Sequence, residues 1–342
     1  MQMGSELTIG IVIYDEIAEI SDLILNLKNE MNHHASYVVV DWIFILNHSD
    51  HNIRNTILLE IKKILPHFNY YENSENNLGF ARNIILTHAK TELVYLTDPD
   101  IEHSSYSLTQ LLNLAILSQQ EKHLMGFTGP VIHQSTKHEM NSMFSLLQYL
   151  SQKIPFSFQI QNHSFMNTVD HAPTCHLLLL RSRALGISGF SENIYFVGED
   201  LDFSHRAYGH GFRFLFSPKS KVIHHQNMNL WSWCKKVRNF GRAQIMSHKK
   251  NSELPFRLYR LVPILFLAVP LTLFFLPQKI IFGLFLFLTI VFLLKRSVIY
   301  LGLTVLSYSL GEMFEILYPQ LKYKNKSEKI QAQHANLEKF SL

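Results

Sequence analysis

Two aspartates stand directly behind a short apolar run in the stretch YLTDPDIEH, at positions 98 and 100. The run LVYLT (93–97) has the length of a buried strand, and acids that follow a parallel strand lie at the sheet edge where open α/β folds bind ligands. Carboxylate oxygens there can hold a hard divalent cation, and the cation can hold a diphosphate. Proline is tolerated between them because strand pairing has ended. Taken alone, Asp-Pro-Asp is more often a plain turn.

Two further stretches carry polar residues at the start of a helical pattern. Upstream, NNLGFARN (76–83) places a glycine in a loop that enters a helix, near Asn77 and Arg82. Such a turn can pass close to a nucleotide, or it can be an ordinary helix start with a surface arginine. Downstream, Glu199 and Asp200 follow an apolar run, and adjacent acids in that position can simply favour the positive end of the helix dipole.

The elements that must position these residues alternate along the first 250 positions. Apolar runs of strand length alternate with helical patterns, which is typical of an α/β domain whose mostly parallel sheet is flanked by helices. In the first helical pattern, apolar residues from Ile17 to Leu27 recur at the three-and-four spacing of a helix face that packs on a sheet. The candidate strands are 7–14, 38–46, 93–97, 125–132 and 175–180.

Length and composition limit the classes of protein. A chain of 342 residues with 47% hydrophobic residues accommodates one domain of about 200 to 250 residues and a smaller unit. The formal charge of +4, without a basic stripe and interleaved aromatic residues, does not indicate a nucleic-acid partner. Two cysteines provide no disulfide framework and suggest a reducing compartment. The opening MQMGSELTIG lacks the features of a signal peptide, so we expect this part of the chain not to be exported.

An apolar region begins abruptly at Leu261 and continues to Leu294, interrupted by one lysine, Lys279. Its two arms, 261–276 and 280–294, are each shorter than the ~20 residues of a full span. They meet at the polar sequence PQK, which predicts a tight hairpin in the bilayer, where prolines within the arms are tolerated. The alternative is a pair of buried helices in a soluble core.

Charges around this region predict its orientation. The positive-inside rule places the preceding domain in the cytoplasm, because the hairpin is flanked by Lys249, Lys250, Arg257, Arg260, Lys295 and Arg296. A third apolar stretch, 298–318, holds two glutamates and precedes a basic tail, so a re-entrant or interfacial placement stays open beside a full span. Before the hairpin, WSWCKKVRNFGRAQ (231–244) can place Trp231 and Trp233 at lipid headgroups or form a solvated basic helix.

In their order and spacing, these stretches resemble the family-2 glycosyltransferases of bacteria, and within them the rhamnosyltransferase-like branch. The resemblance covers roughly residues 7–245 and implies a GT-A fold. It rests on IGIVIYDEIAEI, IFILNHSD, NNLGFARNIIL, YLTDPDIE, GFSENIYFVGEDLDFSHRAYGHGFRF and KVIHH. The chain departs from the family pattern at Leu46 or Asn47, where an acid is frequent, and at Asp15, where asparagine is usual.

The resemblance implies a metal-dependent donor site. Asp98 and Asp100 match the family's Asp-x-Asp motif, with Asp100 as the direct ligand of Mg2+ or Mn2+ and Asp98 as a contact to the ribose or to a metal-bound water. His224 matches a histidine that completes the metal shell in some members, and His225 is its rival. Residues in the places where this family holds the base and ribose are Tyr14, Asp15, Asn47 and Asp50, to which the helix start adds Asn77 and Arg82.

The resemblance also implies the reaction. Asp200 matches the catalytic base of the family's Glu-Asp pair, which takes the proton of an acceptor hydroxyl as that oxygen attacks the anomeric carbon with inversion. Glu199 is expected to orient the acceptor or to raise the pKa of Asp200 through like-charge repulsion.

The sequence thus predicts three parts: a catalytic domain (1–250), membrane-anchoring helices (251–320) and a polar tail (321–342). The expected activity is that of a hexosyltransferase-type, multi-pass enzyme of the cytoplasmic (inner) membrane. It transfers sugar from a nucleotide-sugar donor to an envelope polysaccharide or lipid-linked acceptor beside membrane lipid. Two alternatives stay open: a polyprenyl-phosphate sugar transferase, in which Asp200 is dispensable, and a non-catalytic nucleotide-binding membrane scaffold.

Overall fold

The computed structural model describes residues 6–250 and parts of 303–313, except 15, 33–37, 48–49, 74–76, 119, 139, 146–160, 164–165, 170, 196, 305 and 312. The described residues within 1–132 and 158–225 form one compact unit, and those within 133–157 and 226–321 form a second. All of the candidate site residues that are described lie in the first unit.

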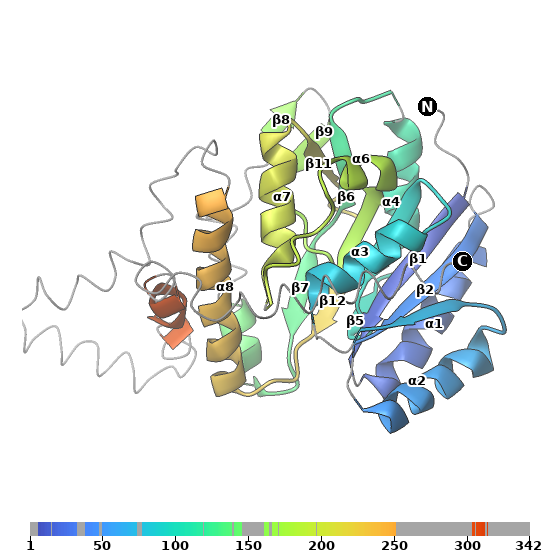
Figure 1. Cartoon of the computed structure of the whole chain (residues 1–342), viewed down its shortest axis with the longest axis horizontal. Coiled ribbons are helices and arrows are strands. Elements are labelled where there is room, and N and C mark those ends of the chain that lie inside the picture. Colours follow the sequence, from blue (N-terminus) through green and yellow to red (C-terminus); the bar gives the residue numbers. More distant parts are fainter. Residues whose placement is uncertain are drawn as a thin grey trace, which may run out of the picture. The chain divides into compact units, whose positions relative to one another are not determined.

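Within the described residues, a 9-stranded sheet has the order β3-β2-β1-β4-β10-β6-β11-β9-β8 (Figure 1). Its members are β1 (Glu6–Ile13), β2 (Val38–Leu46), β3 (Asn69–Glu72), β4 (Leu93–Thr97), β6 (Leu124–Thr128), β8 (Gln161–His163), β9 (Met166–Val169), β10 (His176–Leu180) and β11 (Arg213–Phe216).

The direction of the strands changes at β10. Strands β3, β2, β1 and β4 are parallel, whereas β10 runs antiparallel to both β4 and β6. Beyond it, β11 is parallel to β6 and antiparallel to β9. The sheet is therefore mixed, and the prediction of a mostly parallel sheet was wrong. All five residues of β10 are buried, so its apolar pattern reads the same in either direction and carries no information on orientation.

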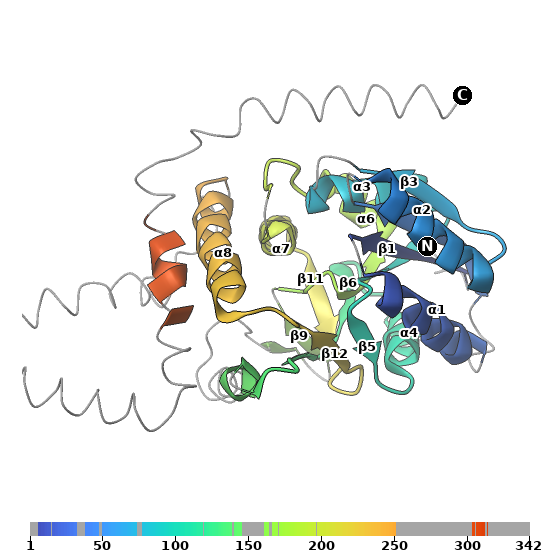
Figure 2. The ribbon, with the colours of Figure 1, turned by 90° about the horizontal axis from the view of Figure 1, so that it is seen from below.

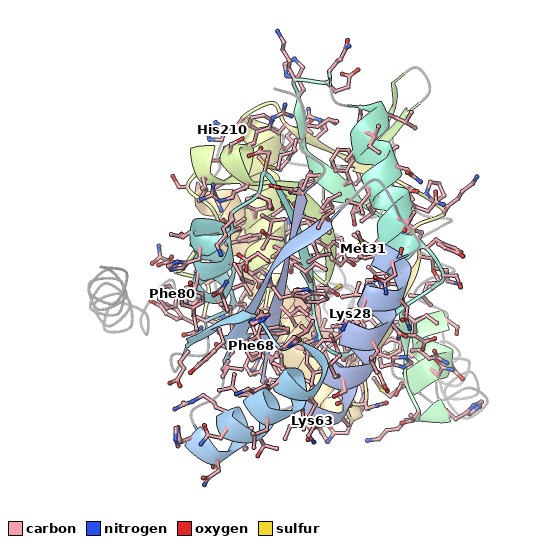
Figure 3. The ribbon with its side chains drawn as sticks, turned by 90° about the vertical axis from the view of Figure 1, so that its right-hand side faces the viewer. Lys28, Met31, Lys63, Phe68, Phe80 and His210 are labelled. Carbon is pink, nitrogen blue, oxygen red and sulfur yellow. The ribbon has the colours of Figure 1, made fainter. Side chains whose placement is uncertain are left out.

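Helices cover both faces of this sheet. One core joins the sheet to α1 (Ile17–Asn32), α2 (His51–Ile64) and α4 (Ser107–Leu117). The other joins it to α3 (Leu78–His88), α6 (Arg181–Gly186) and α7 (Glu199–Gly209). Figure 2 shows α1 and α4 on one side of β1 and α3 and α6 on the other. In Figure 3, Met31 and Phe80 mark these two sides. Alternation of side chains along β1 supplies both cores, with Ile11 in one and Val12 in the other.

A smaller sheet of three strands carries part of the site. Its order is β5-β12-β7, formed by β5 (Ile101–His103), β12 (Val222–His225) and β7 (Val131–Gln134). The candidate strand 125–132 is in fact divided between β6 and β7. The chain leaves the large sheet at Gly129, where a Cβ atom would lie 1.8 Å from the Ser220 carbonyl oxygen, so only glycine fits this close approach. Strands 38–46 and 93–97 were predicted with their observed bounds.

The second unit contains α8 (Leu230–Lys250). Trp233 is buried there, its ring 5.0 Å from that of Phe144 and its indole N–H donating to Thr304 Oγ1 at 2.9 Å. Trp233 is thus packed in an apolar cluster, while Trp231 is exposed. Among the described residues, no helix is both long and apolar enough to span a bilayer. The predicted hairpin, 261–294, and most of the third apolar stretch lie outside the described residues.

Candidate active site

The acid pair lies in a tight turn between β4 and β5. The Asp98 carbonyl accepts a hydrogen bond from the Ile101 amide at 3.3 Å, which closes the turn around Pro99 and Asp100. The side chains of Asp98 and Asp100 are 26% and 29% exposed, so both can reach a ligand without being fully solvated. Because β1, β2 and β4 are parallel, this turn lies at the same sheet edge as the ends of β1 and β2.

The small sheet gives the two neighbouring histidines different partners. β12 runs antiparallel to β5, with His224 opposite Ile101, and the His225 amide donates to the Asp100 carbonyl at 2.9 Å. Successive side chains of a strand point to opposite faces. His224 Nε2 accordingly lies 3.0 Å from Asp100 Oδ2, whereas His225 Nε2 lies 2.7 Å from Glu102 Oε2.

The donor set fits a Mg2+ or Mn2+ ion that also binds a diphosphate. No group of three or more His, Cys, Asp or Glu side chains within the described parts of the chain is arranged to enclose a metal. Such an ion does not need an enclosed site, because it takes one or two carboxylates and completes its shell with water and phosphate oxygens. Asp98, Asp100 and His224 supply oxygen and imidazole ligands of the right kind on partly exposed side chains.

A buried arginine connects the two acidic motifs. Arg82, on α3, is only 3% exposed and pairs with Glu199 on α7 and, at 3.5 Å, with Asp98 Oδ1. Burial lowers the pKa of Arg82, but the charges of Glu199 and Asp98 outweigh that effect and raise it, so the guanidinium stays charged. The tertiary structure therefore brings acids from distant parts of the chain onto one cation.

The helix α7 presents the second acidic motif at its first turn. Gly198 precedes it with φ 110, a left-handed conformation that favours glycine. Asp200 Oδ1 accepts from the Leu201 amide at 2.8 Å, and Oδ2 lies 3.7 Å from His171 Nε2. Burial raises the pKa of Glu199 to about 7, against the opposing charge of Arg82.

Asp200 is held ionised rather than protonated. Burial alone would raise the pKa of Asp200, but the hydrogen bonding and charge of His171, the charge of Arg82 and the Leu201 amide together lower it. Of the two roles expected for Glu199, raising the pKa of Asp200 is opposed by these neighbours, and orienting the acceptor stays a prediction. The sequence did not predict the position of His171 beside Asp200, because no local signal distinguishes it among 19 histidines.

The start of α3 contacts the 189–192 loop, which precedes α7 in the chain. Asn77 is fully buried; its Oδ1 accepts from the Phe80 amide at 2.9 Å and its Nδ2 donates to the Glu192 carbonyl at 2.7 Å. A Cβ atom on Gly79 would lie 2.3 Å from the Ser191 carbonyl oxygen. The glycine thus admits the 189–192 loop. Asn77 and Arg82 are both buried and paired with protein groups, and their contacts to a nucleotide stay a prediction.

The remaining predicted contacts follow the ends of β1 and β2. Asn47 is 1% exposed and accepts from Asn73 Nδ2 at 2.6 Å. Tyr14 is half-buried. Burial is the main cause of the raised pKa of its hydroxyl; the charge of Arg82 opposes the rise and that of Glu199 adds to it. Asp50 is an exposed N-cap of α2 that accepts from the Asn52 amide at 2.8 Å. Asp15 lies outside the described residues.

A closed ring of hydrogen bonds ties β4 to β5 and β10. Ser107 Oγ lies 2.8 Å from His103 Nδ1, and His103 Nε2 lies 3.5 Å from the Tyr95 hydroxyl. That hydroxyl is 2.7 Å from His176 Nδ1, and His176 Nε2 is 2.8 Å from Ser220 Oγ, which donates back to the Ser107 carbonyl at 2.5 Å. Burial lowers the pKa of His103 to about 3 and that of His176 to about 4, so both rings are neutral. Sequence patterns gave no sign of this network.

The mixed sheet with an acid pair after β4 is the GT-A arrangement of glycosyltransferases. The profile of the family described as glycosyl transferase family 2 matches residues 8–182. The chain therefore belongs to glycosyl transferase family 2. The match includes Asp98 and Asp100 but ends before α7 and β12.

The comparison with solved structures found a likeness of fold. A mannosyltransferase from Pyrobaculum calidifontis, PcManGT, in complex with GDP-Man and Mn2+, is 13% identical, with a TM-score of 0.62 over 92% of this chain and 87% of that chain. GalNAc-T7 with UDP, GalNAc and Mn2+ is 12% identical, with a TM-score of 0.48 over 74% and 52% of the two chains. The likeness to the mannosyltransferase concerns the fold alone. No curated protein matches the chain significantly.

Proposed function

We propose that the chain is an inverting, metal-dependent hexosyltransferase that uses a nucleotide-sugar donor. The observation that carries the proposal is the meeting of two acidic motifs in one site: Asp100 beside His224, and an ionised Asp200 linked to Asp98 through Arg82 and Glu199. The motif of Asp98 and Asp100 is suited to the leaving diphosphate, and the motif of Glu199 and Asp200 is suited to the attacking hydroxyl.

Asp200 acts as the general base. The acceptor oxygen attacks the anomeric carbon and forms the new glycosidic bond while the bond to the diphosphate oxygen breaks, and the hydroxyl proton passes to Asp200. Attack from the face opposite the leaving group inverts the configuration. The lowered pKa of Asp200 keeps it deprotonated at neutral pH, and the Leu201 amide fixes one carboxylate oxygen. When bound by Asp98, Asp100 and His224, Mg2+ or Mn2+ supplies positive charge to the departing diphosphate.

Arg82 and Glu199 are positioning residues in this scheme. Both are buried and paired, so neither is placed to contact a sugar. Their ion pair joins α3 to α7 and sets the first turn of α7 against the Asp98 turn.

The proposal extends to the cellular setting on the basis of composition. The apolar region 261–294 and its flanking positive charges support a hairpin in the cytoplasmic membrane, with the catalytic unit on the cytoplasmic side. Anchoring raises the effective concentration of a lipid-linked acceptor or a growing envelope polysaccharide at the site.

The test is transfer or hydrolysis by the purified full chain with a panel of nucleotide sugars, with and without Mn2+. Activity is expected only with metal, and Asp200→Asn is expected to reduce kcat about 10^2- to 10^4-fold because the base is lost. Asp22→Asn, which changes an exposed acid on α1, is the control. Full activity of Asp200→Asn with a sugar hydroxyl acceptor would sink the assignment. Activity of that variant only with polyprenyl phosphate would favour the alternative transferase.

A further inference from the structure

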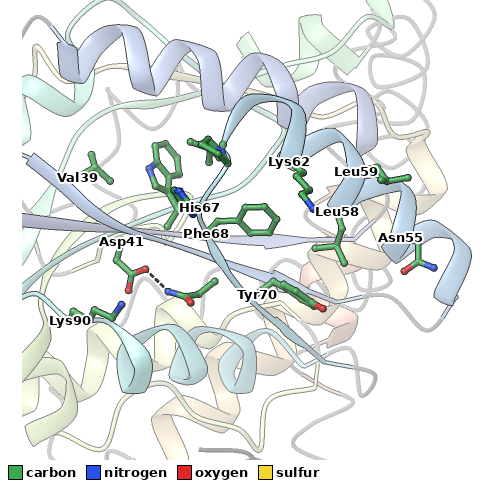
Figure 4. Close-up of a pocket in the computed structure, with 14 residues that line it drawn as sticks. Val39, Asp41, Asn55, Leu58, Leu59, Lys62, His67, Phe68, Tyr70 and Lys90 are labelled. Atoms are coloured by element: carbon green, nitrogen blue, oxygen red, sulfur yellow. Dashed lines mark hydrogen bonds between the residues drawn. The ribbon is translucent and has the colours of Figure 1, made fainter.

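A hollow of about 1080 Å³ lies away from the active site, at the outer edge of the large sheet (Figure 4). β3 pairs only with Ile43–Leu46 of β2, so the first half of β2 borders the hollow with Val39, Asp41 and Trp42. The carboxyl edge lies after Leu46, about 13 to 23 Å beyond these three residues at ~3.3 Å per residue. A ligand in this hollow therefore does not occupy the reaction centre.

The floor of the hollow contains a carboxylate with an unused oxygen. Asp41 is only 4% exposed, and its Oδ1 accepts from Asn69 Nδ2 at 2.7 Å. Its Oδ2 is buried and has no hydrogen-bond partner among the described residues. A buried acceptor without a donor is costly, so a ligand that brings a hydroxyl or N–H group would satisfy it.

Aromatic rings form the wall next to this acid. Phe68 packs edge-on against Phe44 at 5.5 Å, and Trp42 stacks on Phe44 at 6.3 Å, which anchors both rings to the core. Tyr70, 6.3 Å from Phe68, is 47% exposed. Figure 4 shows Phe68 near the centre, with Asp41 and Lys90 toward one end and Leu58 and Leu59 toward the other. The hollow thus offers rigid apolar faces beside polar groups.

The polar groups around the rings include both donors and acceptors. Lys62, Lys90 and Asn55 line the hollow and are exposed, while Asp41 is an acceptor only. The Asp41 carboxylate repels an anion. The turn that contains Pro66, which has no N–H, also borders the hollow, and this disfavours the addition of a peptide strand along β2. A compact ring that carries hydroxyl groups and has one apolar face matches all of these features.

We propose that this hollow is a second saccharide-binding site, which holds a neutral part of the acceptor or product glycan while the reacting end is at Asp200. Its biological meaning rests on the proposed function, but the binding itself does not. Oligosaccharide binding at Asp41 and Tyr70 can therefore be tested independently of sugar transfer at Asp200.

The test uses the full chain and four neutral tetrasaccharides: maltotetraose, cellotetraose, chitotetraose and mannotetraose. Saturation-transfer NMR detects binding, and calorimetry gives Kd. At least one probe is expected to bind, with Tyr70→Ala and Asp41→Asn each weakening it about tenfold or more, since one aromatic or charged contact contributes a factor of that size. Asp200→Asn should bind as the unaltered chain does, even though it lacks transferase activity.

Control variants separate a loss of binding from a loss of folding. Tyr106→Ala removes another exposed tyrosine, 53% exposed, and should leave Kd unchanged; Asp22→Asn is the control for Asp41→Asn, and the Tm of each variant is compared. No binding of any probe would overturn the proposal, as would binding that Tyr70→Ala leaves intact. Binding of inorganic phosphate that is lost on changing Lys62 and Lys90, without oligosaccharide binding, would show an anion site instead.

Discussion

Replacing Arg82 by methionine tests whether the buried ion pair holds the two acidic motifs together. Arg82 is 3% exposed and pairs with Glu199, which is equally buried, and with the partly exposed Asp98. Methionine has a similar length and no charge. The variant leaves Glu199 in the interior without its cation, next to Asp200.

The expected cost follows from the burial of the partner. Above pH 7, where Glu199 is ionised, removing one member of a buried pair costs about 3 to 5 kcal/mol, because the other charge is left uncompensated. Asp98 adds little, since its side chain is 26% exposed and can be solvated. For a unit of this size, ~1 kcal/mol shifts Tm by about 2 to 4 °C, so Arg82→Met should lower Tm by roughly 6 to 20 °C.

The assay is thermal unfolding followed by intrinsic fluorescence, with the double variant Arg82→Met/Glu199→Met as the comparison. Removing both charges lets apolar side chains fill the space, so the double variant should regain most of the lost Tm. The defect of the single variant should also shrink as the pH falls below about 7, where Glu199 takes up a proton. An unchanged Tm for Arg82→Met, or a double variant no more stable than the single one, would refute this account.

Three further predictions concern the supporting structure. Gly79→Ala should cost about 1 to 3 kcal/mol because its Cβ meets the 189–192 loop, whereas Gly186→Ala, with open space around it, should be neutral or slightly stabilising in the same Tm assay. Because the pKa of Glu199 is raised in the folded state, protonation of Glu199 favours folding. Stability on the order of 3 kcal/mol is therefore lost as pH rises from 4.5 to about 7. Glu199→Gln should remove this slope from the Tm–pH curve, and an unchanged slope would contradict the assignment. His176→Phe should lower Tm by about 2 to 12 °C, because the Tyr95 hydroxyl loses its partner at 2.7 Å and keeps only the longer contact with His103. A loss no greater than that of a surface histidine, His210→Phe, would contradict it.

The sequence determined the parts of the protein that depend on local patterns. Apolar runs bounded by turn residues predicted β2 and β4 with their observed bounds, and β1 and β10 within one residue at the ends that differ. Because Asp98 and Asp100 follow a parallel strand, their place at the carboxyl edge also followed from the chain alone. The order of the motifs was sufficient to indicate the family, which the profile match supports independently.

The tertiary structure decided what depends on partners distant in the chain. Strand direction is set by the path of the preceding connection and not by side-chain pattern, so β10 could not be recognised as antiparallel. Arg82 could not be distinguished from a surface arginine, nor His224 from His225, because burial and pairing arise only when α3, α7 and β12 pack against the acid turn. The unsatisfied oxygen of Asp41 is likewise visible only once neighbouring elements have packed around it. Periodicity reports which face of an element is buried, whereas charge compensation depends on which faces meet.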